Sequence, residues 1–242
     1  MPIKFIIPKK NDFQDHTLIT GFHGIGTTGF ITIKYLVNQL GAQKIGTVLS
    51  ESLPPFITTK EGKISLPFEF FQKDKNTMLM PQFQPYRQEH RIFAEKLVEW
   101  TMETKFKRTV LVGGLDSRLR KEESERIRVV ATTQYLNEYE EELPILEEGL
   151  FVTGPLALIL TFYEINDFPA IALLPYAESS RPDPLAASIA VEMINSITNL
   201  DVDTTNLIKD AETIEQNLQE IVSQTKEQGL DEKIQGAKRL YI

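Results

Sequence analysis

The sequence predicts an α/β domain whose central β-sheet is covered by helices. Short apolar runs typical of strands alternate with longer segments whose apolar residues recur at helical spacing. No internal repeat or low-complexity block interrupts this alternation. The chain has 242 residues, of which 41% are hydrophobic and 25% charged, which is typical of a soluble globular protein with one large domain or two small ones.

The first predicted elements are a strand and a helix joined by a glycine-rich turn. Residues 18–20 form an apolar run that ends at Gly21, as expected of a buried strand. Apolar residues between 30 and 40 recur at helical spacing, and Gly41 is placed to end that helix. A second strand is predicted over 45–49.

A hairpin, a strand and a helix are predicted next. Residues 56–66 contain two short strand-like runs around Gly62, a pattern that indicates a β-hairpin. A further strand over 77–80 ends before Pro81, which cannot donate a backbone hydrogen bond. The segment 86–104 carries its large apolar residues at helical spacing and is predicted to be helical.

The middle of the chain continues the alternation. Residues 109–112 form a strongly apolar strand, and 127–131 form another strand with a short polar helix after it. Pro155 suits the first turn of a helix, so 156–163 is predicted to be helical. Residues 170–174 form the last predicted strand.

Two helices complete the prediction. Asp183 followed by proline is a favourable cap and first-turn pair for a helix over 185–197. Thr204 or Thr205 is expected to cap a long amphipathic helix that ends near Gln228. The sequence therefore divides into one α/β domain that includes its C-terminal helix, residues 1–228, and a flexible tail, residues 229–242.

Composition excludes several classes of function. The formal net charge of −8 disfavours nucleic-acid binding, and the basic stretches 105–108 and 118–128 are expected to be solvated faces. No apolar run could span a bilayer, and residues 1–5 lack the features of a signal peptide. The chain has no cysteine, which excludes disulfides and thiolate metal sites. We expect a cytoplasmic protein that binds neither membrane nor nucleic acid.

The glycine-rich turn after the first strand has two interpretations. Its possible ligand-binding or structural residues are Gly21, His23, Gly24, Gly26 and Gly29. The last three form a G-x-G-x-x-G pattern, which can present backbone N–H groups to a phosphate. Glycines also let a strand turn sharply into a helix that lies close to the sheet. The structural interpretation is favoured, because three residues separate the strand from the pattern and a hairpin follows the next strand.

Candidate catalytic groups are few. Of the three histidines, only His23 has a suggestive position, where it could orient a phosphate or act as a base but more commonly would cap the turn. Asp116 and Arg118 follow a predicted strand end, where α/β proteins often place ligand sites, and could equally form a surface ion pair or a subunit contact. No nucleophile elbow or metal-binding spacing is present. We therefore predict no catalytic residue, no metal and no cofactor.

The order of these motifs resembles that of the proteasome assembly chaperone family of the second-subunit type, in its archaeal form. The resemblance begins with the strand, turn and helix of residues 18–40 and extends over nearly all of the chain to about residue 225. It includes Lys44-Ile45-Gly46, Leu53-Pro54-Pro55, Val112-Gly113-Gly114, Val152-Thr153-Gly154 and Asp183-Pro184-Leu185-Ala186-Ala187.

This resemblance implies an α/β core similar to that of nucleoside phosphorylases, in three layers around a mixed sheet. It also implies a homo-oligomer that binds the α ring of the proteasome core particle as an assembly chaperone or an ATP-independent activator. Leu240, Tyr241 and Ile242 have the hydrophobic-Tyr-X form of a proteasome-docking tail. The alternatives are an enzyme of phosphorylase or hydrolase type that uses the glycine turn at 21–29, and a structural oligomer locked by its tails.

Overall fold

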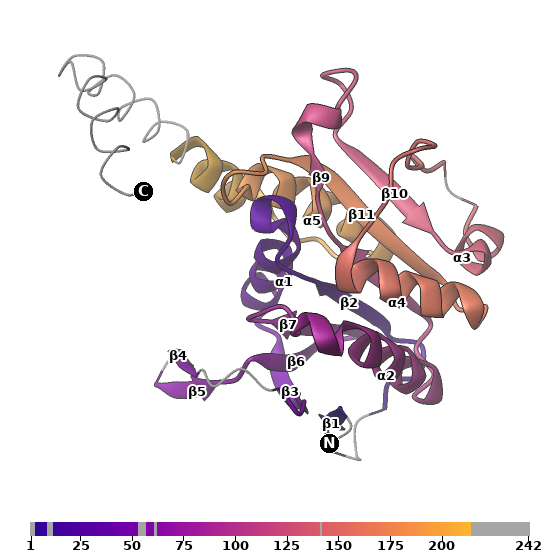
Figure 1. Cartoon of the computed structure of the whole chain (residues 1–242). Coiled ribbons are helices and arrows are strands. Elements are labelled where there is room, and N and C mark those ends of the chain that lie inside the picture. Colours follow the sequence, from indigo (N-terminus) through magenta and orange to yellow (C-terminus); the bar gives the residue numbers. More distant parts are fainter. Residues whose placement is uncertain (1–2, 9–11, 53–56, 61, 141, 214–242) are drawn as a thin grey trace, which may run out of the picture.

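The computed structural model describes residues 3–8, 12–52, 57–60, 62–140 and 142–213 (Figure 1). The tail with Leu240, Tyr241 and Ile242 lies outside these residues, as does most of the C-terminal helix predicted before it. In the part that is described, no helix is both long and apolar enough to cross a membrane, and no cluster of three or more His, Asp or Glu side chains could hold a metal ion.

The elements follow one another in an alternating α/β order. The strands are β1 (Lys4–Ile6), β2 (Thr17–Gly21), β3 (Gln43–Leu49), β4 (Thr58–Lys60), β5 (Lys63–Ser65), β6 (Phe68–Lys73), β7 (Asn76–Pro81), β8 (Arg108–Val112), β9 (Leu115–Asp116), β10 (Ile127–Ala131) and β11 (Ala170–Ala177). The helices are η1 (Ile25–Thr27), α1 (Thr28–Gln39), η2 (Arg87–Glu89), α2 (His90–Glu103), η3 (Ser117–Leu119), α3 (Thr133–Glu138), α4 (Gly154–Ile165) and α5 (Pro184–Thr198). A further helix begins at residue 205 and is described to residue 213.

The central sheet is mixed, as predicted. Its strand order is β1-β3-β6-β7-β2-β8-β11-β10, with β9 also paired to β11. Strands β7, β2, β8 and β11 run parallel to their neighbours in the middle of the sheet, whereas β1, β3, β6 and β10 pair antiparallel towards its edges. Hairpin β4–β5 forms a separate two-stranded sheet that stands away from the body (Figure 1).

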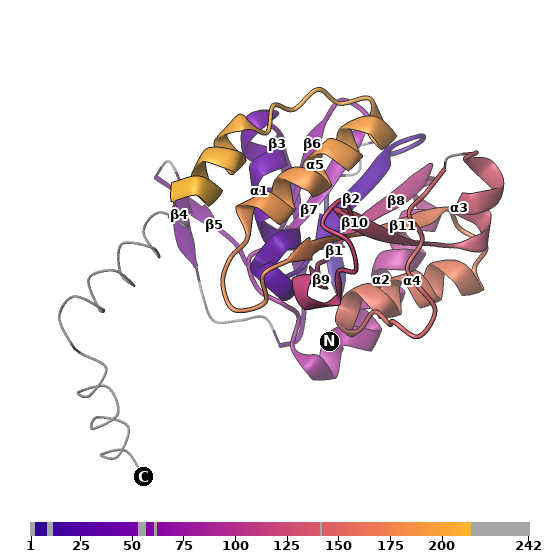
Figure 2. The same ribbon diagram turned by 90° about the horizontal axis from the view of Figure 1, so that it is seen from above.

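Helices cover both faces of this sheet and complete the predicted three layers (Figure 2). Helices α1 and α5 pack together on one face, and α2 and α4 pack together on the other. Alternate residues of the central strands point to opposite faces. In β2, for example, Leu18 joins the core under α2 and α4, whereas Ile19 joins the core under α1 and α5. Both side chains are fully buried, as the continuous apolar run indicated.

The predicted strands, helices and hairpin that fall within the described residues are all present. Three strands were not predicted: β1, β6 and β9. Each of them is short, lies near an edge of the sheet, or follows a glycine pair. Helix α5 is capped as expected, since the Asp183 side chain accepts a hydrogen bond from the Ala186 N–H. The last helix begins at residue 205, where the Asp203 carboxylate accepts from the Thr205 N–H.

The expectation of solvated basic faces is wrong for Arg108. This residue is only 8% exposed, and its guanidinium donates to the Ile197 carbonyl at the end of α5. The same group lies over the Tyr139 ring, 4.9 Å from its centroid. A cation at the C-terminal end of a helix is favoured by the helix dipole, so tertiary contacts account for the burial of this charge.

His16 is a second titratable group inside the fold. It is 4% exposed, and its Nδ1 lies 3.1 Å from the Thr77 hydroxyl oxygen. Burial is the main cause that lowers the pKa of His16 below 6.5, and the charge of Lys75 adds to it, while Asp12 and Asp15 act in the opposite direction. The folded protein therefore favours neutral His16.

This shift predicts that acidification weakens the fold. The unfolded chain takes up the His16 proton near pH 6.5 and the folded chain only at lower pH, so stability is full above pH 6.5 and declines below it. The free energy of unfolding, measured by chemical denaturation, should fall between about pH 7.5 and about pH 5.5. In the variant His16→Asn, whose amide can still meet Thr77, the decline should be smaller. Equal declines in both proteins would contradict the assignment to His16.

Candidate functional site

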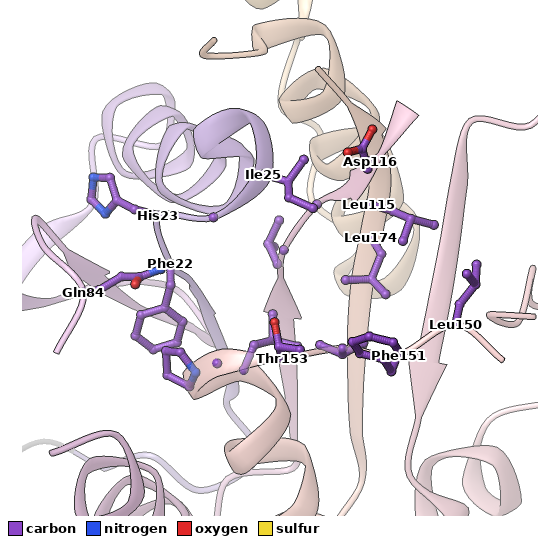
Figure 3. A pocket seen from close by; sticks show the side chains of 18 of the residues that line it. Phe22, His23, Ile25, Gln84, Leu115, Asp116, Leu150, Phe151, Thr153 and Leu174 are labelled. Carbon is purple, nitrogen blue, oxygen red and sulfur yellow. The ribbon is translucent and has the colours of Figure 1, made fainter. Parts of the chain in front are cut away.

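A cavity of about 600 Å³ opens where the central parallel strands end. Its walls come from the turn after β2, the segment after β8, residues 150–156 before and at the start of α4, and Leu174 of β11. Figure 3 shows Phe22, Ile25, Leu174 and Phe151 arranged around the central space. Segments that lie far apart in the sequence therefore build one site.

The topology of the sheet explains this position. The chain leaves β2 through α1 on one face of the sheet, whereas the connection from β8 to β11 passes through α4 on the opposite face. At such a switch point the two connections diverge and leave a crevice beyond the carboxyl ends of the strands, which is where ligands bind in open α/β sheets. The cavity occupies this crevice between β2 and β8.

A glycine pair separates β8 from β9 beside the cavity. Strands β8 and β9 pair with β11 in one unbroken register, from Thr109 opposite Ala170 to Asp116 opposite Ala177. Gly113 and Gly114 lie between the two strands and line the cavity. Strand β2 ends opposite Val112. Beyond Val112, the segment that leads from β8 to β9 therefore lies beside the glycine turn and lines the cavity.

Three of the predicted turn glycines are required by close packing. A Cβ on Gly29 would lie 2.5 Å from the Val112 carbonyl oxygen and 2.7 Å from the backbone of Phe22. A Cβ on Gly21 would lie 2.8 Å from the Cα of Gly29. Gly26 has a φ of 61°, and a Cβ there would lie 2.8 Å from the side chain of Ala177. These contacts hold the start of α1 directly against the sheet, as the structural interpretation predicted.

Gly24 differs from the other turn glycines. A Cβ built on it meets no atom within 4 Å, and the residue lines the cavity together with His23 and Ile25. Close packing therefore does not account for a glycine at this position.

His23 neither caps the turn nor forms a catalytic contact in the described residues. Its ring stacks on Phe30 with centroids 4.3 Å apart, and its buried Nδ1 has no hydrogen-bond partner among the residues that are described. Burial lowers the pKa of His23 below 6.5, so the neutral ring is favoured. In Figure 3 the ring lies at the outer side of the cavity.

Asp116 and Arg118 form the ion pair that the sequence suggested. The guanidinium donates to the Asp116 carboxylate at 2.9 Å through Nε and at 2.5 Å through Nη2, and the Arg118 backbone N–H donates to it at 3.0 Å. These hydrogen bonds hold the pKa of Asp116 at about 2, so the carboxylate is ionised at neutral pH. Both oxygens are committed to Arg118 at the edge of the cavity.

The glycine turn is also fixed from the side of α5. The Asp183 N–H donates to the Gly26 carbonyl at 2.8 Å, and the Asp183 carboxylate accepts from the N–H groups of Ala186 at 2.9 Å and Glu178 at 2.8 Å. One side chain therefore joins the start of α5 to the loop after β11 and lies against the turn.

Loss of this side chain should weaken the fold measurably. Asp183→Ala removes a helix cap and leaves two N–H groups without their acceptor, so we expect the free energy of unfolding to fall by about 1–3 kcal/mol. Asp183→Asn keeps one side-chain acceptor and should lose less. Urea denaturation of the three proteins checks the order, and an unchanged stability of Asp183→Ala would contradict the role of the cap.

Most of the chain matches one protein family. The model of the PAC2 family matches residues 18–222, which include every segment that lines the cavity. The chain belongs to the PAC2 family. Two uncharacterized proteins of Methanocaldococcus jannaschii are 27% identical over 225 residues and 25% identical over 232 residues. The first alignment covers 92% of each chain, and the second covers 90% of this chain and 89% of the other.

Solved structures confirm the PAC2 fold. Pyrococcus furiosus PbaA, an archaeal homolog of proteasome-assembly chaperone, is similar with a TM-score of 0.81 and 23% identity over 100% of both chains. Pyrococcus furiosus PbaB, an archaeal proteasome activator, is similar with a TM-score of 0.77 and 21% identity. That match covers 91% of this chain and 98% of PbaB. At these identities the likeness establishes the three-layer architecture.

The cavity lining contains residues from both places that the sequence marked as candidate ligand sites. His23 and Gly24 come from the glycine turn, and Asp116 follows the end of β8 after Gly113 and Gly114. The contribution of Phe151 was missed. It lies in the apolar run 150–152, yet its side chain is 79% exposed at the cavity. No sequence signal distinguishes such a residue from a core aromatic.

Proposed function

We propose that this PAC2 protein is a non-enzymatic partner of the proteasome that acts as an assembly chaperone, an activator, or both. The main support is its similarity along the whole chain to PbaA and PbaB, whose names connect this fold with proteasome assembly and activation. Family membership rests independently on residues 18–222. Its location would be that of the proteasome, in the cytoplasm.

Docking would use the C-terminal tail. Leu240 and Tyr241 would enter pockets between neighbouring α subunits of the core particle, and the Ile242 carboxylate would pair with a lysine there. Tyrosine suits this role because it offers a rigid apolar surface together with a hydroxyl group. Residues 229–239 would act as a flexible arm with a reach of roughly 30–40 Å when extended. A homo-oligomer would present several tails at once, which raises the effective affinity.

The geometry of Asp116 and His23 near the sheet end supports a non-enzymatic role. Asp116 is neutralised by Arg118, and His23 stacks on Phe30. Each group is committed to a structural contact instead of forming an acid–base pair with the other.

The direct test is binding of the intact protein to purified core particle from the same source, measured by native electrophoresis or interferometry. Peptide-hydrolysis rates of the same mixtures then separate the two roles: an activator raises the rate, whereas a chaperone binds assembly intermediates without raising it. Absence of binding to both the mature particle and its α-ring intermediates would refute the proposal.

A further inference from the structure

We infer that the cavity beyond the ends of β2 and β8 is a binding site for a neutral, mainly apolar small molecule that contains a ring. Proteasome docking by the tail does not require this site, so the inference is independent of the proposed function. It rests on the size and place of the cavity, on the chemistry of its lining, and on an exposed aromatic side chain at its edge.

Size and place favour a small-molecule ligand. The cavity volume of about 600 Å³ lies within the range of roughly 300–1,000 Å³ that small-molecule sites occupy. The cavity also lies at the switch point of the parallel strands, where α/β sheets bind their ligands.

The lining sets the polarity of that ligand. Most of its side chains are apolar, including Phe22, Leu156 and Leu174. Among the described residues that line the cavity, Asp116 is the single acidic residue, and lysine and arginine are absent. Because the Asp116 carboxylate already accepts hydrogen bonds from Arg118, it does not offer a free charge to a cation. An anion is disfavoured because no described lysine or arginine of this lining could pair with it.

Few polar side chains in the lining are free to orient a ligand by hydrogen bonds. His90 donates through Nε2 to the Pro85 carbonyl at 2.8 Å, which commits that nitrogen. The side chains of Gln84 and Thr153 line the cavity and can form one or two hydrogen bonds with a ligand (Figure 3). His23, also in the lining, has a buried Nδ1 without a partner among the described residues, and its neutral ring adds one further polar atom. An apolar body with one or two neutral polar groups matches this set, since a buried charge would find no partner.

Phe151 gives the site an apolar edge. It is 79% exposed, which leaves a large aromatic surface in water, and Leu119 at the same cavity is 42% exposed. Exposed apolar surface beside a concavity marks binding sites, because a ligand that covers it removes that surface from water. Gly24 adds space, since no atom lies within 4 Å of its Cβ position.

Two probes of the same shape test the inference with the intact protein. We expect 2-naphthalenemethanol, which is neutral, to bind saturably and to shift the backbone amide resonances of Gly113 and Gly114 in two-dimensional NMR. The amides of Gly41 and Gly62, which do not line the cavity, should not move. The anion 2-naphthoate should bind at least about tenfold more weakly, because its carboxylate would be desolvated in a lining that has no lysine or arginine among its described residues.

Matched variants locate the bound molecule. Phe151→Ala should weaken binding of the alcohol about tenfold. Ile165→Ala, which removes another exposed side chain (69%) at the far end of α4, should leave binding unchanged. Gly24→Leu should block the cavity and abolish binding, while circular dichroism and thermal unfolding confirm that it folds. The inference is overturned by absence of saturable binding, by tighter binding of the naphthoate, or by equal effects of Phe151→Ala and Ile165→Ala.

Discussion

Removal of Leu240, Tyr241 and Ile242 should abolish binding of this protein to the proteasome core particle. If the tail docks as proposed, its apolar side chains and its terminal carboxylate supply the specific contacts. Loss of every tail from an oligomer also removes the gain from multivalency, which is about 10²–10⁴-fold. We therefore expect affinity to fall by at least about 100-fold in interferometry with immobilised core particle.

Point variants separate the contributions within the tail. Tyr241→Ala should lose nearly as much affinity as the deletion, whereas Tyr241→Phe keeps the ring and should lose only part of it. A short tag fused after Ile242 displaces the carboxylate and should also abolish binding. In each case the oligomer mass measured by light scattering should be unchanged. Normal binding by the tagged protein or by Tyr241→Ala would show that another surface carries the interaction.

Gly29→Ala should cost more stability than any other single-methyl change in the glycine turn. The added Cβ would lie 2.5 Å from the Val112 carbonyl oxygen and 2.7 Å from the Phe22 nitrogen and oxygen. All three are backbone atoms at the ends of β2 and β8, so they cannot move aside as the end of a side chain could. Overpacking of this kind should reduce the free energy of unfolding by about 2–4 kcal/mol.

Gly24→Ala is the matched control in the same turn. Its Cβ position has no atom within 4 Å, so we expect a cost below about 1 kcal/mol. Urea denaturation of the two variants beside the parent protein measures the difference. If both glycines bound a phosphate and neither were required by packing, the two variants would have similar, small effects on stability. Equal stabilities would therefore overturn the structural interpretation of Gly29.

The fold class and most elements followed from local signals in the sequence. The run 18–20 indicated a buried strand because both of its faces are covered by helices. Asp183 before proline indicated a helix start, because a side-chain acceptor there satisfies a free N–H group. The division of the chain after residue 228 and the role of the tail stay predictions, since these residues lie outside the described part.

The candidate site could be predicted only in part. The G-x-G-x-x-G pattern marked the right turn, but it did not distinguish Gly29, which touches the backbone of β8, from Gly24, which faces open space. That distinction depends on a strand about eighty residues later in the chain. The residues next to Gly29 in the sequence do not predict its contact with Val112, because that contact exists only after β2 and β8 pair.

The sequence by itself determined the alternation of strands and helices, the helix caps, and membership of the family. Each of these depends on neighbouring residues or on motif order. Only the tertiary structure decided that Arg108 is buried at the end of α5, that Phe151 is exposed, and that a cavity lies beyond the ends of β2 and β8. Those features depend on which elements become neighbours in space, and pairing between distant segments leaves no periodic signal in either segment alone.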